Sequence, residues 1–150
     1  MKPKIKAIIF DWVDTLYERD KDLFPFTLNV VKYLSQKYKL GLISLASEEN
    51  LKKRKHEIET SPIYSYMDYV IIDQTKTPKQ YNDCMKEMGV TPDQTMVVDD
   101  RTIRGILVGN KLGCKTCWVT KGKYANQVPD EQTGEPDYRI ESIEELLDML

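Results

Sequence analysis

The chain has 150 residues, 41% of them hydrophobic, which is enough for one domain with a substantial core but hardly for two. Its 22 basic and 24 acidic residues give a formal net charge of -2, so the overall charge indicates no binding to nucleic acid or to an anionic membrane. No apolar run approaches the roughly 20 residues of a membrane-spanning helix, and no signal-peptide pattern precedes the first apolar run, so we expect a cytoplasmic protein.

Short apolar runs rich in β-branched residues alternate with amphipathic stretches along the chain. Strands are expected at residues 5–10, 40–46, 68–73, 95–98 and 116–119, with a short edge strand at 138–140. Helices are expected at residues 25–39, 48–58, 78–88 and 103–112, and again after a capping box at 142–145. The alternation predicts right-handed βαβ units in a doubly wound, three-layer α/β/α fold with a mainly parallel central sheet.

One α/β domain is expected to span residues 1–150. Its core is expected to cover roughly residues 4–120. The polar segment 121–137, which contains glycines and prolines, is expected to be an exposed loop. Residues 138–150 are expected to add the short edge strand and a C-terminal helix.

Acidic residues follow two of the expected strands. Asp11 comes directly after the first strand, and Asp99 and Asp100 come after the fourth. In an open α/β sheet, ligands bind at the edge formed by the carboxyl ends of the parallel strands. These three carboxylates are therefore candidates for one functional site.

The segment Phe10-Asp11-Trp12-Val13-Asp14-Thr15-Leu16 resembles the first motif of the haloacid dehalogenase (HAD) superfamily, whose phosphatases carry Asp-x-Asp-x-Thr after a buried first strand. Asp11 matches the nucleophile of that motif. The second aspartate of the motif acts as general acid and then as base, and Val13 stands in its place here. Asp14 lies one residue later, and we do not interpret it as the displaced acid.

Three further motifs of the superfamily can be matched in the same order. Ser44, near the end of the second strand, resembles the Ser or Thr that donates a hydrogen bond to a phosphoryl oxygen. Lys76 resembles the lysine that offsets negative charge, with Lys79 as a rival for that role. Asp99-Asp100 resembles the acidic metal-binding motif. The pattern is closest to the capless magnesium-dependent phosphatase group, which implies a HAD-like fold without a separate cap domain.

The resemblance implies Mg2+ as the cofactor, held by carboxylates of Asp11 and the 99–100 pair and by the main-chain carbonyl of Val13. Mg2+ keeps several of its water ligands when it binds to a protein, so few protein ligands suffice. The implied reaction is hydrolysis of a phosphoester through an aspartyl-phosphate on Asp11, with Ser44 and Lys76 assisting. General acid–base catalysis typically contributes about 10²–10⁴-fold, so its loss at Val13 predicts weak activity. The substrate is expected to be a phosphorylated small molecule or a phosphoprotein.

Two other functions fit the same motifs. The first is a non-catalytic HAD-like module that keeps the metal site for binding or regulation. The second is a dehalogenase-type hydrolase, which needs no acid at position 13 but usually requires a cap domain.

Cys114 and Cys117 have the CxxC spacing of many zinc and redox sites. On a strand, side chains three residues apart point to opposite faces of the sheet. The sequence therefore favours buried packing cysteines over a zinc or redox site.

Overall fold

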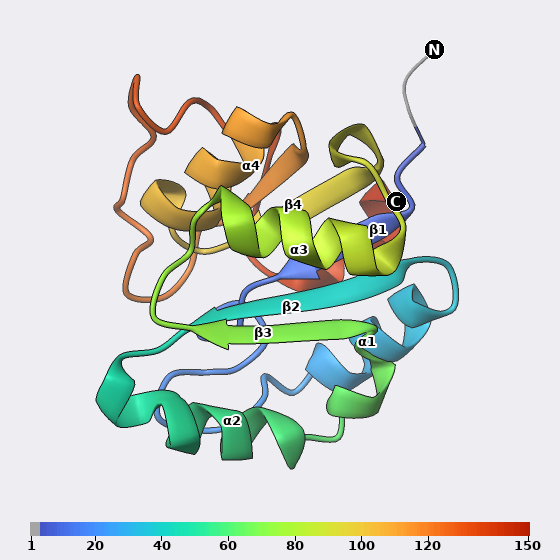
Figure 1. Cartoon of the computed structure of the whole chain (residues 1–150), viewed down its shortest axis with the longest axis vertical. Helices are drawn as coiled ribbons and strands as arrows, with labels where there is room; N and C mark the ends of the chain where they lie inside the picture. Colours follow the sequence, from blue (N-terminus) through green and yellow to red (C-terminus); the bar gives the residue numbers. More distant parts are fainter. Residues whose placement is uncertain (1–3) are drawn as a thin grey trace.

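The computed structural model describes residues 4–150 and arranges them in three layers, with helices on both faces of one central sheet (Figure 1). The sheet has six strands in the order β3-β2-β1-β4-β5-β6. Its strands are β1 (Ala7–Phe10), β2 (Lys39–Leu45), β3 (Tyr69–Asp73), β4 (Thr95–Asp99), β5 (Lys115–Val119) and β6 (Tyr138–Ile140). Every neighbouring pair is parallel, so the expected α/β fold is confirmed and the sheet is wholly rather than mainly parallel.

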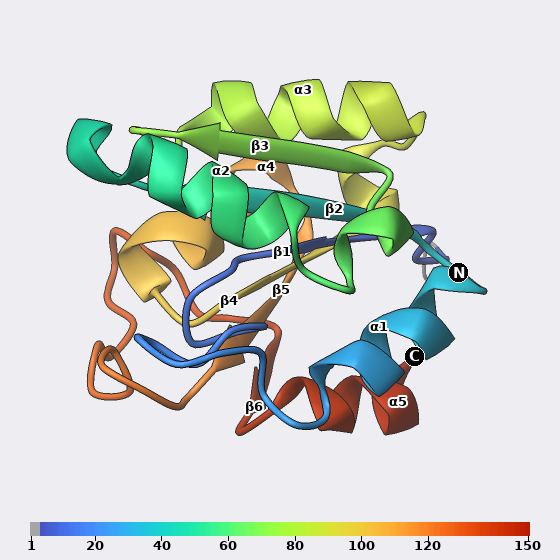
Figure 2. The ribbon, with the colours of Figure 1, turned by 90° about the horizontal axis from the view of Figure 1, so that it is seen from below.

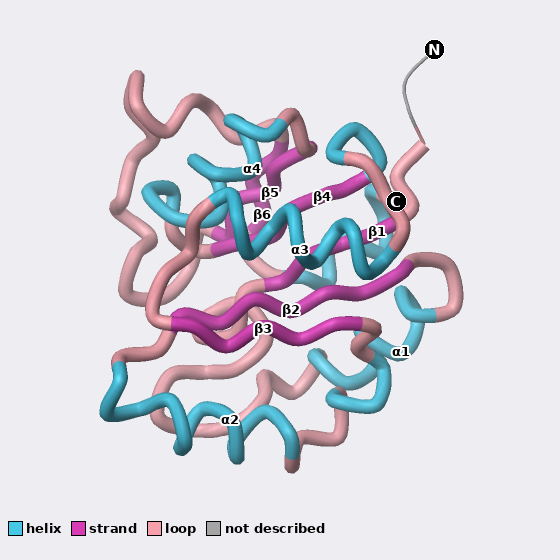
Figure 3. The backbone as a smooth tube through the Cα atoms, viewed as in Figure 1, coloured by secondary structure: helices cyan, strands magenta, loops and turns pink. Residues whose placement is uncertain are grey.

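Five α-helices and several short turns of helix connect the strands (Figure 3). The α-helices are α1 (Thr27–Ser35), α2 (Leu51–Glu59), α3 (Pro78–Met88), α4 (Leu107–Leu112) and α5 (Leu146–Met149). A π-helical turn at Thr102–Ile106 leads into α4. No second domain is inserted between these elements within residues 4–150, and none of the described helices is long and apolar enough to cross a membrane.

Alternating side chains of the strands supply two separate cores. Ile8 and Phe10 of β1 belong to one core with residues of α1, α2 and α5, whereas Ala7 and Ile9 belong to the other with residues of α3 and α4. Figure 2 shows α3 on one side of the sheet and α1 and α5 on the other. Because both faces of β1 are covered, the strand reads as an unbroken apolar run in the sequence.

The strand order reverses next to β1, which positions the functional edge of the sheet. The chain runs from β1 outward through β2 to β3, and then returns to pair β4 with the other side of β1. In the β1–β4 pair, Phe10 lies opposite Val98. Loops leaving the carboxyl ends of β1 and β4 diverge at such a reversal, and the crevice between them is the usual ligand site of this architecture.

Two helix boundaries differ from those expected. The expected helix at residues 25–39 is shorter, because α1 stops at Ser35 and Lys39 already belongs to β2, where its backbone amide donates to the carbonyl of Lys6 at 2.9 Å. The expected helix at 103–112 begins with the π-helical turn instead of α-helix. In the first case strand pairing overrides the local helical pattern.

The 121–137 segment forms neither strand nor helix, as expected, but it is not simply an exposed loop. Pro129 and Thr133 are buried. The Thr102 hydroxyl donates to the carbonyl of Gln127 at 2.9 Å, and the Asn110 amide donates to the carbonyl of Thr133 at 2.9 Å. The segment therefore packs against the π-helical turn and α4, and these contacts fix its path past the carboxyl end of β4.

The three cysteines are buried and reduced. Cys117 packs in the core formed with α1, α2 and α5, and Cys114 packs in the core formed with α3 and α4. The two sulfur atoms of the CxxC sequence thus lie on opposite faces of the sheet. The prediction that these cysteines are packing residues is confirmed.

Candidate active site

The carboxylates of Asp11, Asp99 and Asp100 form one cluster, in which an oxygen atom of each lies within 4.8 Å of those of the other two. Asp11 follows β1, and its backbone amide donates to the carbonyl of Val98 at 3.0 Å, which continues the β1–β4 pairing. Asp99 ends β4, and both Asp99 and Asp100 are 1% exposed. The parallel pairing of two strands far apart in the sequence thus brings these three acids together.

Backbone amides and an indole fix the position of the 99–100 pair. The amide of Gly105 donates to Oδ2 of Asp99 at 3.0 Å, and the amide of Arg101 donates to its Oδ1 at 3.0 Å. A side chain at position 105 would overlap the Asp99 carboxylate, so the close approach of the π-helical turn requires glycine there. The Trp118 indole donates to the carbonyl of Asp100 at 3.0 Å.

Lys76 lies within the acidic cluster. Its Nζ is 2.6 Å from Oδ1 of Asp11 and 3.1 Å from Oδ2 of Asp99, and its side chain is 2% exposed. It directly precedes Thr77, the N-cap of α3, which forms a capping box with Gln80. The rival Lys79 is 78% exposed and pairs with Asp83 on the surface, so Lys76 is the lysine that the fold places in the site.

The acidic cluster contains three carboxylates but only one ammonium group, and this imbalance shifts the pKa values of Asp11, Asp100 and Lys76. Burial, followed by the charge of Asp99, raises the pKa of Asp11. Burial, followed by the charges of Asp11 and Asp99, raises the pKa of Asp100 to about 11. Burial lowers the pKa of Lys76, but the charges of Asp11 and Asp99 outweigh it and raise that pKa well above its ordinary value. The cluster therefore holds more negative charge than Lys76 can offset.

The donor set of this cluster fits a divalent cation such as Mg2+. All its side-chain ligands are carboxylate oxygens, which Mg2+ prefers. Oδ2 of Asp100 is buried and has no hydrogen-bond partner within residues 4–150. Because buried polar atoms nearly always have a partner, Oδ2 of Asp100 is the carboxylate oxygen of the cluster that is best placed to bind a cation.

Ser44 lies near the end of β2, buried, and it is held by an arginine. Nη1 of Arg54 donates to Oγ of Ser44 at 2.6 Å and to the carbonyl of Leu45 at 3.0 Å. Nε of Arg54 is 3.4 Å from a carboxylate oxygen of Glu57, which also accepts from the Trp12 indole at 2.6 Å. A guanidinium can only donate, so the hydroxyl of Ser44 accepts from Arg54 and keeps its own proton free for a ligand.

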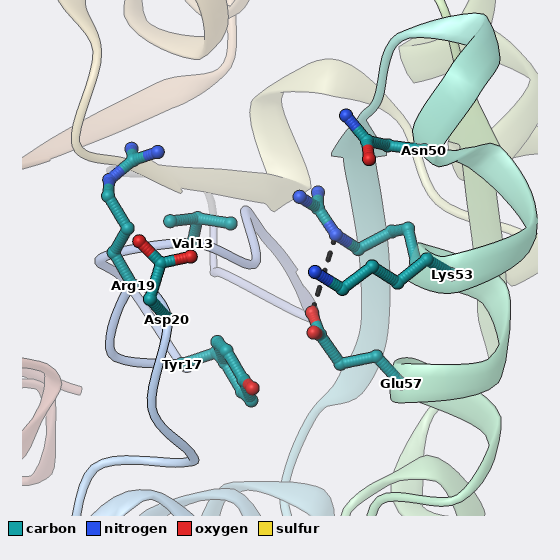
Figure 4. A pocket seen from close by; sticks show the side chains of 8 residues that line it. Val13, Tyr17, Arg19, Asp20, Asn50, Lys53 and Glu57 are labelled. Carbon is teal, nitrogen blue, oxygen red and sulfur yellow. Dashed lines mark ion pairs between the residues drawn. The ribbon is translucent and has the colours of Figure 1, made fainter.

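Two adjoining cavities open beside Asp11. The smaller, of about 120 Å³, is lined by Asp11, Val13, Arg19, Leu45, Arg54, Lys76, Asp100, Arg101, Arg104 and Tyr124. The larger, of about 390 Å³, shares Val13, Arg19 and Arg54 with it. In Figure 4, Val13, Tyr17 and Arg19 face Lys53 and Glu57 across the larger cavity. Val13 thus lies between the acidic cluster and the larger cavity.

Asp14 does not line the cavity that holds Asp11. Its backbone has a φ of 63°, and its carboxylate is 3.3 Å from Nη2 of Arg19. Gly122 packs directly against this carboxylate. The Asp14 carboxylate is thus paired with Arg19 and does not line the small cavity. This agrees with the interpretation that Asp14 is not a displaced acid.

Residues 1–119 match the family described as haloacid dehalogenase-like hydrolase, which covers well over half of the chain. The chain belongs to this family. Among curated proteins, the chain is 36% identical over 66 residues to a glyceraldehyde 3-phosphate phosphatase of Methanocaldococcus jannaschii, a match covering 44% of this chain and 28% of the relative. It is 27% identical over 118 residues to the Pyrococcus furiosus protein of the same name, covering 75% of this chain and 48% of the relative. The chain spans less than half the length of these curated relatives.

Solved structures share the fold of this HAD-like hydrolase at low sequence identity. A HAD phosphatase from Thermococcus onnurineus superposes with a TM-score of 0.78 at 16% identity, covering 97% of both chains. A haloacid dehalogenase-like family protein from Streptococcus pneumoniae gives a TM-score of 0.75 at 14% identity, covering 97% of this chain and 98% of the other. At such identities these matches bear on the fold alone.

The sequence reasoning missed the basic side chains that surround the site of this HAD-like hydrolase. Arg54 lies on α2 in a run of four basic residues, and nothing local distinguishes it from its neighbours. Arg101 directly precedes the π-helical turn and Arg104 lies within it, and the guanidinium carbon of Arg101 lies 4.0 Å from the ring centre of Tyr124. The one available signal was Arg101, because it directly follows the Asp99-Asp100 motif.

Proposed function

We propose that this HAD-like hydrolase catalyses the Mg2+-dependent hydrolysis of a small phosphate monoester, with Asp11 as the nucleophile. The observation that carries the proposal is the cluster of Asp11, Asp99 and Asp100 within 4.8 Å, with Lys76 in contact with two of the three acids. Such a cluster offers a nucleophile and a cation site in one place.

Positive charge is the first requirement of this reaction. A carboxylate that approaches a phosphate dianion is repelled by about 4 kcal/mol per pair of charges at 4 Å and an effective dielectric constant near 20. Lys76 would supply one positive charge next to Asp11. A bound Mg2+ would supply the larger part, since it would neutralise phosphoryl oxygens as well as the carboxylates.

The Mg2+ ligands in this proposal are Asp11, Asp100 and the main-chain carbonyl of Val13. Asp100 is preferred to Asp99 as the direct ligand, because Asp99 already accepts from Gly105, Arg101 and Lys76. Oδ2 of Asp100 has no such partner within the described chain. Asp99 would then keep Lys76 in place.

The chemical steps follow from these positions. The Asp11 carboxylate attacks phosphorus, the bond to the leaving alcohol oxygen breaks, and an aspartyl-phosphate forms on Asp11. Ser44 donates its free proton in a hydrogen bond to a phosphoryl oxygen, and Lys76 offsets charge on the nucleophile. Water then hydrolyses the aspartyl-phosphate and releases inorganic phosphate.

Val13 limits the rate in this proposal. Its hydrocarbon side chain can neither protonate the leaving alcohol nor activate the attacking water, so both steps rely on solvent. The missing general acid–base catalysis corresponds to about 3–5 kcal/mol of barrier. Substrates with good leaving groups should therefore react fastest, and alkyl phosphates slowly.

The same valine favours a second candidate, a non-catalytic module that binds a metal ion and a phosphate. Val13 lines both cavities, whereas Asp14 is paired with Arg19 and lines neither of them, so Asp14 does not replace the missing acid. The curated relatives named glyceraldehyde 3-phosphate phosphatases support a phosphorylated small molecule, rather than a phosphoprotein, as the ligand in either case.

An assay with p-nitrophenyl phosphate and Mg2+ tests the proposal. The native protein should release p-nitrophenol, and Asp11→Asn or removal of Mg2+ with EDTA should abolish the release. Asp83→Asn is the matched control, because Asp83 is exposed and pairs with Lys79 on the surface. If Asp11→Asn retains the native rate, the hydrolase proposal is wrong; if neither protein reacts but Mg2+ still binds, the non-catalytic module is favoured.

A further inference from the structure

We propose that Arg101 and Arg104 form a second anion-binding subsite beside Asp11. The substrate would then be a short phosphate monoester that carries another anionic group, such as a carboxylate. This inference rests on the proposed function, because it assumes that the phosphoryl group lies at Asp11.

Positive charge around the small cavity exceeds what the protein itself pairs. Five basic side chains line it, against the carboxylates of Asp11 and Asp100. Three of the five have acidic partners: Lys76 contacts Asp11 and Asp99, Arg54 contacts Glu57, and Arg19 contacts Asp14. The remaining two are Arg101 and Arg104.

Neither of these two arginines has a side-chain partner in the part of the chain that the structure describes. No ion pair or side-chain hydrogen bond involves Arg101 or Arg104 within residues 4–150, and Nε of Arg101 is buried without an acceptor. A buried donor without an acceptor is unfavourable in a folded protein. A bound anion would supply the acceptor that the chain does not.

The guanidinium of Arg101 is held ready for such an anion. Its carbon lies 4.0 Å from the ring centre of Tyr124, so the ring supports the guanidinium. The same segment is tied to the π-helical turn where the Thr102 hydroxyl donates to the Gln127 carbonyl. A positioned planar guanidinium can bind a carboxylate or a phosphate through two parallel hydrogen bonds.

The transferred phosphoryl group does not by itself account for these arginines. In the proposed function, Lys76, the hydroxyl of Ser44 and the cation already offset the charge of the phosphoryl group. The cavity of about 120 Å³ is smaller than the roughly 300–1,000 Å³ of typical small-molecule sites, so a second anionic group in it must lie close to the phosphate. A phosphorylated acid with a backbone of two or three carbons has this chemistry.

The test compares 3-phosphoglycerate with glycerol 3-phosphate, which has an uncharged CH2OH group where the other has a carboxylate. The native protein with Mg2+ should show a kcat/KM for 3-phosphoglycerate at least about tenfold higher, the ratio that one charge-assisted contact can give. Arg101→Gln and Arg104→Gln should each bring the ratio towards one. Lys79→Gln should keep the native ratio, because Lys79 is 78% exposed and pairs with Asp83 on the surface.

Equal kcat/KM values for the two compounds in the native protein would overturn the subsite, and so would variants that lower both values by the same factor. Calorimetric binding of the two compounds to Asp11→Asn separates this inference from the proposed function. A binding preference for 3-phosphoglycerate without turnover by the native protein would support the subsite and refute the hydrolase. Turnover of p-nitrophenyl phosphate without any preference would do the reverse.

Discussion

Nζ of Lys76 lies 2.6 Å from Oδ1 of Asp11, although the two residues are 65 positions apart in the chain. This buried contact, together with that to Asp99, makes Lys76 the only protein cation in direct contact with the acidic cluster among the described residues. The position of Lys76 therefore affects stability and chemistry at the same time.

Replacing Lys76 by methionine should destabilise the metal-free protein. Breaking a buried ion pair by removing one partner typically costs about 3–5 kcal/mol, because the remaining charges are left unpaired. Without Lys76, protonation of the acids becomes easier, so the loss should shrink as the pH falls. Urea unfolding at pH 5 and pH 7.5 measures the free energy of unfolding of Lys76→Met and of the exposed control Lys79→Met. Equal stability of the two variants at pH 7.5 would contradict the prediction.

Asp100 should link stability to pH and to Mg2+. Its pKa in the fold is about 11, above the ordinary value near 3.9, so folding favours its protonated form. The resulting stabilisation is complete below about pH 4 and is lost as the pH rises towards 11. Asp100→Asn carries no charge at any pH, so the metal-free variant should melt a few degrees higher than the native protein at pH 7.5, with a smaller difference near pH 5.

Mg2+ should reverse that order at pH 7.5. Binding to the folded state raises the melting temperature of the native protein, because the ion requires the ionised carboxylate, whereas Asp100→Asn should show little response. Thermal unfolding of both proteins in 0 and in 10 mM Mg2+ measures this response. An unchanged Mg2+ response in Asp100→Asn would show that Asp100 is not a ligand.

Val13→Asp should increase turnover of an alkyl phosphate such as glycerol 3-phosphate by at least about tenfold, towards the 10²–10⁴-fold typical of general acid–base catalysis. The gain for p-nitrophenyl phosphate should be smaller, because its leaving group needs no proton. Val13→Asn is the matched control, since an asparagine side chain has the shape of an aspartate side chain but cannot act as a general acid or base. A gain of equal size with asparagine would attribute the effect to polarity instead.

Arg54 should act on catalysis through Ser44. Its Nη1 donates to the Ser44 hydroxyl at 2.6 Å, so removing Arg54 frees that hydroxyl to turn away from the ligand. Ser44→Ala and Arg54→Met should each lower kcat/KM, and the double variant should lose less than the product of the two factors. Lys55→Met on the same helix is exposed and serves as control. Strictly multiplicative losses would show that the two residues act independently.

The acids of the site could be predicted from the sequence because their positions depend on local pattern. Asp11 and Asp99 stand where apolar runs stop, and a parallel sheet puts such points on one edge. Lys76 could be named but not separated from Lys79, because the local sequence does not show which of the two side chains reaches Asp11.

The basic residues of the site could not be predicted in this way. Arg54 is one of four consecutive basic residues, and only the packing of α2 decides which of them reaches Ser44. Tyr124 lies in a segment without regular secondary structure, whose path depends on contacts with Thr102 and Asn110. The amide of Gly105 in the π-helical turn donates to Asp99, and no helical pattern in the sequence indicates this contact.

The pairing of β1 with β4 also bears on how the molecule assembles during synthesis. Ala7 lies opposite Thr95 in that pair, so the first strand must wait for most of the polypeptide before its second neighbour is available. Contacts between such distant segments form late and slow the folding of a chain. An emerging polypeptide that stops short of Asp99 holds Asp11 without its partners, so capture of a divalent ion would report that β4 has paired with β1.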